Sequence, residues 1–278
     1  MKEYDVVIVG GGPAGIVSAF TAKRYFPEAE ILLIKREKEG VIPCGIPYMI
    51  SSLKEPEENA LSSAPLEKIS VKVLVDEVIE IKRGEKKILT SDGNTFIYKK
   101  LILACGSVPV KPEIPGIDKE NIFMIKKEMK YLKKMVEHLK KARKVLIVGG
   151  GFIGVEFADE ISKLPNVEEV YIVEILPEIL SNSFDKEFSE MAKERLKKKG
   201  VKILTGKKVV EFCGKEKVEK VKLSDGEFIE VDTVILGIGA KPNSYLAENC
   251  GLEITKRKAI WTDEYMRTSD PDIFAVGD

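Results

Sequence analysis

One pattern occurs twice in this 278-residue chain: an apolar run that ends in G-x-G-x-x-G and continues into a helix-like stretch. The first copy, "DVVIVGGGPAG", opens at Asp5, and the second, "KVLIVGGGFIG", opens at Lys144. Each copy then returns to a short apolar strand, "ILLI" at 31–34 and "VYIV" at 170–173. Strand, glycine turn, helix and strand in this order predict a βαβ unit, so we expect two such units.

The three glycines of each motif have separate physical roles. The first permits a tight turn, the second lets the backbone approach a pyrophosphate, and the third allows close packing of helix on strand. The N-terminus of the following helix presents free N–H groups and a positive dipole end to the phosphates. Two motifs in this context predict two dinucleotide sites, and hydride transfer is the chemistry expected between them. The glycines are Gly10, Gly12 and Gly15 in the first copy and Gly149, Gly151 and Gly154 in the second.

The repeat continues beyond the glycine motifs. The stretches "SDGNTFIYKKLILACGSVP" (91–109) and "SDGEFIEVDTVILGIGAKP" (224–242) share a Ser-Asp-Gly start, an apolar alternation and a buried strand that ends in small residues and a proline. The Asp-Gly pairs are typical of hairpin turns. The expected fold class is α/β, with two Rossmann-like three-layer ββα domains that each carry an antiparallel β-meander excursion.

The residue at the end of the second strand of such a unit usually contacts the adenosine ribose, and it is usually acidic. In the second copy this residue is Glu174, whose carboxylate would repel a 2′-phosphate, so we predict NADH over NADPH. The first copy departs from the rule, because Lys35 and Arg36 occupy the position and Glu37 is the nearest acid. The ribose contact of the first nucleotide is therefore left open by the sequence.

Composition excludes several other classes of protein. Lys+Arg and Asp+Glu both number 45, which gives no reason to expect a nucleic-acid partner. No leader pattern and no bilayer-length apolar run are seen, so we expect no membrane partner and a cytoplasmic location. The amide-poor, Lys/Glu-rich balance is typical of a thermophile. The four cysteines form no C-x-x-C pair, so neither a zinc site nor any other metal site is expected.

At this point the motifs resemble a known family. "GGGPAG", "LILACGSVPVKPEIPG", "VLIVGGGFIGVEFA", "VILGIGAKPN" and "RTSDPDIFAVGD" follow one another as in the FAD/NAD(P)-dependent pyridine nucleotide–disulfide oxidoreductases. The resemblance implies FAD in the first site and NAD(P)H in the second. It also implies a discontinuous FAD-binding domain, residues 1–108 and 236–278, around an NAD(P)H-binding domain, residues 109–235.

The resemblance further implies roles for single residues. Asp278 matches an aspartate that binds the ribityl chain of FAD, Phe152 an aromatic that covers the flavin, and Glu156 a glutamate near the nicotinamide. The residues expected to bind FAD are Gly10, Gly12, Pro13, Ala14, Gly15, Lys35, Arg36, Cys44, Val78, Ala104, Cys105, Gly106, Gly277 and Asp278. Those expected to bind NADH are Gly149, Gly151, Phe152, Ile153, Gly154, Glu156, Glu174 and Gly239.

Within the family, "PCGIPY" at 43–48 is most similar to coenzyme A-disulfide reductases and the related NADH oxidases and persulfide reductases, which use a single cysteine. Met49 stands where a second cysteine of a C-x4-C pair would be. Pro13 stands where the peroxidase branch carries a histidine. The only histidine, His138, lies in a Lys-rich helical stretch and is interpreted as a solvated surface residue, so peroxidase activity is disfavoured.

Cys44 is the candidate redox thiol, and Tyr48 is a candidate proton donor or hydrogen-bond partner for the substrate sulfur. We hypothesise that electrons from NADH reduce an oxidised Cys44, either a mixed disulfide or a sulfenic acid, and that the thiolate attacks the next disulfide. The surrounding sequence places Cys44 at the start of a short helix, whose dipole would favour the anion. The alternatives are a buried structural Cys44 and a Tyr48 that only packs. Cys105, Cys213 and Cys250 are interpreted as structural.

The chain ends at Asp278, whereas full-length relatives are expected to continue into a dimerisation domain and to form homodimers. Three functions therefore stay open: a reductase of a small-molecule disulfide, polysulfide or CoA-disulfide, an NADH oxidase that reduces O2, and an FAD- and NADH-binding fragment without turnover. The sequence does not name the electron acceptor.

Overall fold

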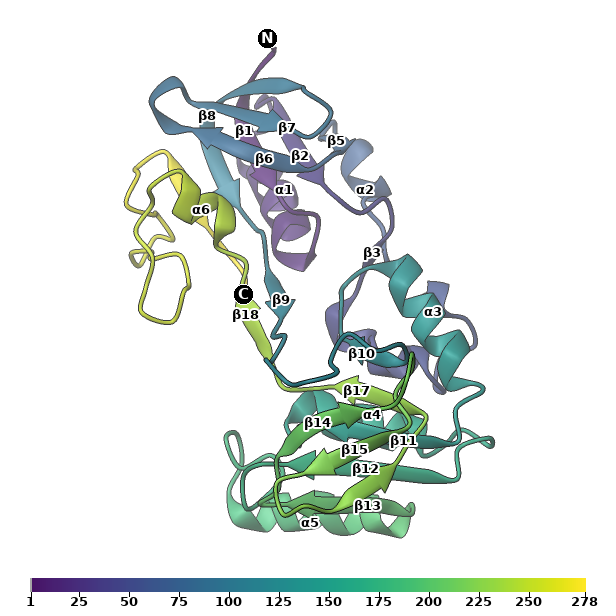
Figure 1. Ribbon diagram of the computed structural model, residues 1–278. Coiled ribbons are helices and arrows are strands. Elements are labelled where there is room, and N and C mark those ends of the chain that lie inside the picture. Colours follow the sequence, from purple (N-terminus) through teal and green to yellow (C-terminus); the bar gives the residue numbers. More distant parts are fainter. Residues whose placement is uncertain (1) are drawn as a thin grey trace. The chain divides into compact units, whose positions relative to one another are not determined.

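A computed structural model describes residues 2–278 of the chain, and these residues divide into two compact units (Figure 1). The first unit comprises residues 2–42, 60–108 and 241–278, and the second comprises residues 43–59 and 109–240.

The two units depart from the predicted domain boundaries at two segments, residues 43–59 and residues 236–240. Residues 43–59, which were expected in the FAD-binding domain, cluster with the second unit. The physical reason is a set of hydrogen bonds from the hydroxyls of Ser51 and Ser52 to the carboxylate of Glu160. Nothing in the glycine motifs or the repeat indicated this contact.

The first unit is built on a parallel sheet that agrees with the predicted βαβ unit. The sheet order is β5-β2-β1-β8-β7-β6, and β19 pairs in parallel with β8. All of β2 is buried, as expected for a parallel strand that is covered on both faces. The parallel strands are β1 (Lys2–Val9), β2 (Ile31–Lys35), β5 (Lys72–Val75), β8 (Thr95–Leu103) and β19 (Ile273–Ala275).

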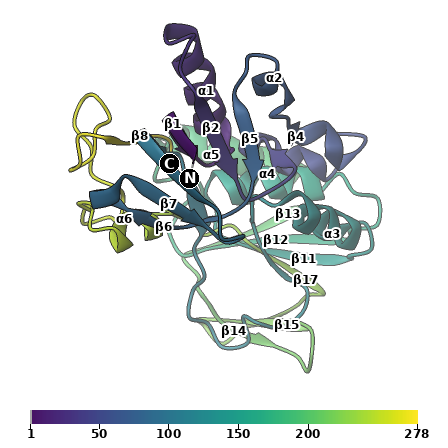
Figure 2. The same ribbon diagram turned by 90° about the horizontal axis from the view of Figure 1, so that it is seen from above.

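Different elements cover the two faces of this sheet. Figure 2 shows helices α1 and α2 on one face and the β6–β7 hairpin on the other. The bounds are α1 (Pro13–Tyr25), α2 (Ala64–Glu67), β6 (Val78–Lys82), β7 (Lys87–Thr90) and α6 (Tyr245–Asn249). Three shorter elements also belong here, β3 (Gly40–Val41), β4 (Ala60–Leu61) and η4 (Arg83–Glu85).

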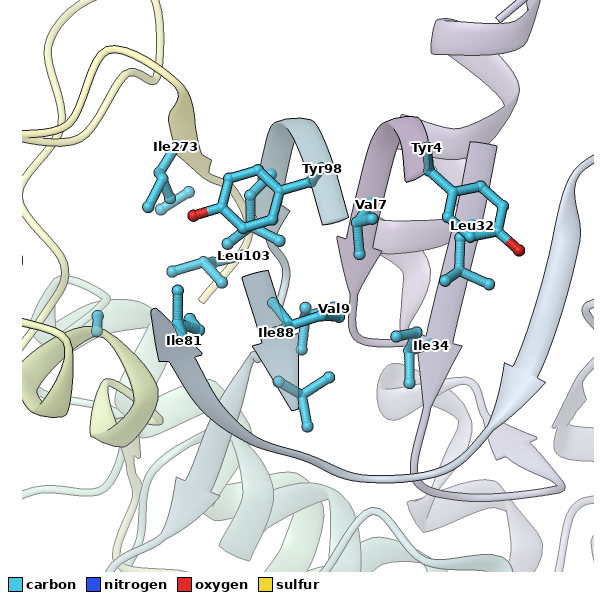
Figure 3. Packing of buried hydrophobic residues seen from close by; sticks show 14 of the residues in the cluster. Tyr4, Val7, Val9, Leu32, Ile34, Ile81, Ile88, Tyr98, Leu103 and Ile273 are labelled. Carbon is cyan, nitrogen blue, oxygen red and sulfur yellow. The ribbon is translucent and has the colours of Figure 1, made fainter. Parts of the chain in front are cut away.

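The core between the sheet and its hairpin joins residues that lie far apart in the sequence (Figure 3). Val7 and Leu32 of the parallel strands pack in one cluster with Ile88 of the hairpin and Ile273 of the last strand. Fully burying such side chains stabilises the fold by about 1.5–3 kcal/mol each. The final segment of the chain is therefore an integral part of the first unit.

The second unit repeats the same plan. Its parallel sheet has the order β10-β17-β11-β12-β13, and a separate antiparallel sheet, β14-β15-β16, packs on it through a shared apolar cluster. The parallel strands are β10 (Ile122–Met124), β11 (Lys144–Val148), β12 (Glu169–Glu174), β13 (Val201–Thr205) and β17 (Thr233–Leu236). The antiparallel strands are β14 (Val209–Cys213), β15 (Lys220–Leu223) and β16 (Phe228–Glu230).

Figure 2 shows α3, α4 and α5 on the opposite side of this sheet from β14 and β15. Their bounds are α3 (Met129–Leu139), α4 (Phe152–Ile161) and α5 (Lys186–Lys198). The remaining short elements are η1 (Pro43–Gly45), η2 (Pro47–Met49), η3 (Pro56–Asn59), β9 (Ser107–Pro109) and β18 (Ala240–Pro242). Both units thus have the predicted helix, sheet and meander layers, which confirms the expected fold class.

The two meanders differ in one respect. In the first unit β8 runs unbroken from the hairpin into the parallel sheet, whereas the matching stretch of the second unit is split into β16 and β17. The break lies at Asp232, whose carboxylate accepts hydrogen bonds from the backbone N–H groups of Arg143 and Lys144. Both predicted Asp-Gly hairpin turns are present, with Gly93 and Gly226 at positive φ.

His138 is not the solvated residue that the sequence suggested. Its ring lies 5.1 Å from the ring of Phe123, and its Nε2 is 2.8 Å from Thr233 Oγ1. The side chain is half-buried, and desolvation lowers its pKa from the ordinary value. The expectation failed because His138 lies beside the apolar stripe of an amphipathic helix, which the many lysines of α3 conceal in the sequence.

Asp76 orders the turn between β5 and β6. Its Oδ1 accepts hydrogen bonds from the Glu77 backbone and the Ser91 hydroxyl, at 2.7 and 2.8 Å. Burial disfavours the charge, but hydrogen bonds from Thr90, Ser91, the Glu77 backbone and Asn94 outweigh burial and lower the pKa of Asp76 to about 2. The pKa is therefore below its ordinary value of 3.8. The ionised carboxylate contributes its full share to the free energy of unfolding above pH 3.8, and this share is lost as the pH falls towards 2.

We predict that Asp76→Asn lowers the free energy of unfolding by about 2 kcal/mol at pH 7, because several buried donors lose a charged acceptor. The difference from the parent protein should shrink by about 1 kcal/mol at pH 3. Urea titrations at both pH values measure it. Asp92→Asn, at an exposed aspartate in the adjacent turn between β7 and β8, is the control. An equal Asp76 effect at both pH values would contradict the prediction.

Candidate functional site

The first glycine motif has the steric character of a nucleotide cradle. Gly10 lies at φ +119°, and a Cβ there would lie 2.1 Å from the carbonyl oxygen of Ala104. A Cβ on Gly15 would lie 2.0 Å from the carbonyl oxygen of Gly10, so helix α1 can approach the strand only without a side chain. A Cβ on Gly12 would meet nothing within 4 Å. The first and third glycines therefore serve packing, and the second borders open space.

The second motif repeats this geometry. A Cβ on Gly149 would lie 2.6 Å from the carbonyl oxygen of Gly237, and one on Gly154 would lie 1.9 Å from that of Gly149. Gly151 again borders open space. Within residues 2–278, no side chain caps the N-terminus of α1 or of α4. The first backbone N–H groups of each helix are therefore available to an anion.

A pocket of about 640 Å³ opens at the second cradle. It brings together most of the residues predicted to bind NADH, namely Gly149, Gly151, Phe152, Ile153, Glu174 and Gly239. Gly154 is buried beneath the turn, and Glu156 lies on the exposed side of α4, where partial desolvation raises the pKa of its carboxyl. The lining residues that sequence reasoning missed include Pro112, Ile175, Asn182, Lys207 and Lys208, which come from loops without a motif.

Glu174 is held in a fixed orientation at this pocket. Its Oε2 accepts a hydrogen bond from the Gly150 N–H, and its Oε1 accepts one from the Leu176 N–H at 2.8 Å. The residue is only 8% exposed. Phe152 is 51% exposed at the same pocket, and its ring packs edge-to-face on Phe184 at 5.5 Å.

Lys35 occupies in the first cradle the place that Glu174 occupies in the second. A Cβ on Gly11 would meet the side chain of Lys35, as one on Gly150 would meet Glu174. The ammonium donates hydrogen bonds to the Lys38 carbonyl at 3.0 Å and to Ser63 Oγ at 2.8 Å, and burial lowers the pKa of Lys35. The first cradle therefore has a buried lysine at the position where the second has a buried glutamate.

The other residues predicted to bind FAD divide into three groups. Arg36 is an exposed partner of Glu37. Val78 is buried in the core. A small pocket of about 140 Å³ gathers Cys105, Gly106, Gly277 and Asp278, and Ser107 Oγ donates to the Asp278 carboxylate at 2.9 Å. A Cβ on Gly277 would lie 3.0 Å from Cβ of Ala14, which places this pocket beside the start of α1.

Cys44 is exposed on η1, and Tyr48 is 47% exposed on η2. Neither side chain has a hydrogen-bond partner within the described part of the chain. The helix expected at Cys44 is only a pair of single 3-10 turns, so the dipole that the sequence suggested is small. Met49, at the place of a second cysteine, is buried.

The remaining three thiols are less exposed than Cys44, and desolvation disfavours their thiolate forms. Burial raises the pKa of Cys105 to about 11. Burial also raises the pKa of Cys213 and Cys250. Since the thiolate is the reactive form, Cys44 is the accessible candidate among the four cysteines. Among residues 2–278, no cluster of histidine, cysteine and acidic side chains is suited to a metal ion, and no helix is long and apolar enough to cross a membrane.

Fold and site together define a two-nucleotide Rossmann protein with one exposed thiol. The chain belongs to the pyridine nucleotide-disulphide oxidoreductase family, whose sequence pattern matches residues 4–278. This family and its NADH oxidases use FAD and NADH. The open space at Gly12 and the uncapped start of α1 fit the FAD pyrophosphate, and the pocket at Gly151 fits NADH.

Three relatives illustrate the similarity. The chain is 34% identical to an NADH oxidase of Methanocaldococcus jannaschii, over 98% of this chain and 62% of that protein. It is 33% identical to an NAD(P)H coenzyme A polysulfide/persulfide reductase of Pyrococcus horikoshii, over 100% and 63%. The crystal structure of reduced CoADR-RHD of Bacillus anthracis superposes with a TM-score of 0.91 at 29% identity, over 100% of this chain and 51% of that one. The chain thus spans about three fifths of the length of the curated relatives.

Proposed function

We propose that this chain carries the nucleotide sites and the redox cysteine of an NADH-dependent flavoprotein reductase of small disulfides, polysulfides or CoA-disulfide. The observation that carries the proposal is the single exposed thiol, Cys44, in a chain with two dinucleotide cradles. Similarity to a coenzyme A polysulfide/persulfide reductase supports it. The unpaired cysteines fit a reducing compartment, and we therefore propose a cytoplasmic location.

FAD, when bound, supplies two-electron redox chemistry. The residues proposed to hold it are the first glycine motif and the start of α1 for the pyrophosphate, Lys35 for the adenosine ribose, and Asp278 for the ribityl hydroxyls. Lys35 would donate to ribose oxygens, whereas a carboxylate would accept from ribose hydroxyls. The second cradle is proposed to hold NADH, with Glu174 as acceptor for the ribose hydroxyls.

Cys44 performs the sulfur chemistry in this proposal. Its thiolate attacks one sulfur of the acceptor R–S–S–R, so that a Cys44–S–S–R bond forms and RS⁻ leaves. Tyr48 is proposed to supply the proton that converts the leaving RS⁻ to RSH. Two electrons from NADH then cleave the mixed disulfide, which restores the Cys44 thiolate and releases the second RS⁻.

NADH oxidase activity, with O2 as the acceptor, is the second candidate. It is favoured by two relatives that carry this name and are each 34% identical to the chain. One experiment separates the candidates: the purified protein with FAD is mixed with NADH without oxygen, and CoA-disulfide, polysulfide or air is then added. Bleaching of the flavin by NADH and recovery on CoA-disulfide or polysulfide is the expected result. Recovery only in air would favour the oxidase, and no bleaching would contradict both.

A further inference from the structure

Glu160 is a buried charge that the proposed chemistry does not use. It lies near the C-terminal end of α4 and is 2% exposed. A buried carboxylate is tolerated only when it is paired and hydrogen-bonded. Here it accepts hydrogen bonds from Ser51 Oγ at 2.6 Å and from Ser52 Oγ at 2.8 Å, and Lys163 Nζ lies at 2.5 Å. These partners lower the pKa of Glu160 despite burial, so the group is an anion in the folded protein.

Two of these partners belong to residues 43–59, which we call the cysteine segment because they carry Cys44. The segment is folded into successive turns between Pro43 and the serines, and Cys44 lies in the first of them. Backbone bonds run from Ile46 to Pro43, from Met49 to Ile46, and from Ser52 to Tyr48. Only six residues separate Cys44 from Ser51, so these turns connect the thiol closely to the contact at Glu160.

The cysteine segment also contacts the second unit in other ways. Met49 and Ile50 are buried, and Glu57 forms an ion pair with Lys133 of α3 at 2.5 Å. Glu57 is exposed, so that pair is weak in water. The Glu160 carboxylate is buried, and removing it would leave the hydroxyls of Ser51 and Ser52 without their acceptor, whereas Lys163 would keep its ion pair with Asp159. It is therefore a buried polar attachment between the segment and α4.

The opposite end of the same helix carries the second glycine motif. Gly151 caps α4, and Glu160 lies on its last turns. We propose that Glu160 is a positioning residue that clamps the cysteine segment onto the nucleotide-binding helix and so fixes where the Cys44 thiol is presented. The inference rests on the proposed redox role of Cys44. The clamp keeps the thiol and helix α4 in one rigid body, so that turnover depends on a residue that touches neither substrate nor cofactor.

The test compares Glu160→Ala with Asp159→Ala in the holoenzyme. Asp159 is a matched control, because it precedes Glu160 on α4 and pairs with Lys163 and Lys199, and within residues 2–278 it forms no ion pair or hydrogen bond with the cysteine segment. Two readouts do not depend on turnover: the rate of Cys44 alkylation by iodoacetamide, and the rate of tryptic cleavage after exposed Lys54 within the segment. We expect Glu160→Ala to accelerate cleavage about tenfold or more and to change the alkylation rate at least about fivefold, because the segment opens more often. Asp159→Ala should leave both rates near those of the parent protein.

A second variant, Ser51→Ala with Ser52→Ala, removes the same contact from the other side and keeps the test valid if Glu160→Ala fails to fold. Combining the serine changes with Glu160→Ala should add little to either rate, since all act on one contact. The proposal is overturned if Glu160→Ala or the serine variant lowers the melting temperature yet leaves cleavage and alkylation as in Asp159→Ala. Because both readouts are taken without an electron acceptor, an altered rate supports the clamp even if the parent protein reduces no disulfide.

Discussion

Replacing Cys44 with serine is expected to reduce disulfide turnover by roughly 10³-fold or more while leaving the bleaching of flavin by NADH unchanged. A serine hydroxyl stays protonated near neutral pH and cannot form a mixed disulfide, so the acceptor has no covalent route to the electrons. The two cradles do not involve the Cys44 side chain in their packing. Anaerobic stopped-flow spectra with NADH, followed by CoA-disulfide or polysulfide, measure both steps on one sample.

Cys250→Ser is the matched control for this variant. Cys250 is half-buried, burial raises the pKa of its thiol, and its Sγ donates to the Ala247 carbonyl at 3.4 Å. It should retain turnover, apart from a modest loss of stability. If Cys44→Ser reduces disulfides as fast as Cys250→Ser, the exposed thiol has no part in the reaction. Retained reaction with air alone would assign the chain to the oxidase alternative.

The parts of this fold that the sequence predicted are those fixed by local sterics. Gly10 and Gly15 could be interpreted because a turn and a close helix–strand approach tolerate no Cβ, and this constraint is visible in a motif. The Asp-Gly hairpins were predictable for the same reason, since they need positive φ at one residue. Because the glycine motif and the Asp-Gly turn each occur twice in the chain, each prediction rested on two occurrences.

The parts that the sequence did not predict depend on contacts between residues far apart in the chain. Glu160 accepts a hydrogen bond from Ser51, which lies more than one hundred residues away in the sequence. No local sequence pattern predicts a buried carboxylate on an otherwise ordinary amphipathic helix. Lys35 was known only as a departure from the acidic rule. Its inward orientation follows from Ser63 and the Lys38 carbonyl, which supply acceptors in three dimensions. Position in the repeat predicts where a side chain lies, and distant partners determine what it can do there.

The coenzyme preference of the second cradle should reverse when the charge at its ribose position is reversed. Glu174 places a fixed carboxylate at the pocket, and Ile175 beside it is 60% exposed and also lines the pocket. In Glu174→Ala with Ile175→Arg, the repulsion of a 2′-phosphate is removed and a guanidinium able to bind phosphate through two hydrogen bonds is supplied. We expect the ratio of NADPH to NADH affinity to rise at least about 100-fold, which corresponds to about 3 kcal/mol.

Fluorescence titrations of NADH and NADPH against the holoenzyme measure this ratio without any electron acceptor. Glu178→Ala is the control, because Glu178 lies four residues further along, pairs with Lys193 at 3.4 Å and is not part of the pocket lining. Loss of the Glu174 carboxylate also removes the acceptor for the Gly150 and Leu176 N–H groups, so both affinities should fall somewhat in Glu174→Ala alone. The ratio separates this loop effect from charge recognition, since a disordered loop weakens both coenzymes alike. An unchanged ratio in the double variant would mean that the ribose end of the coenzyme does not reach Glu174.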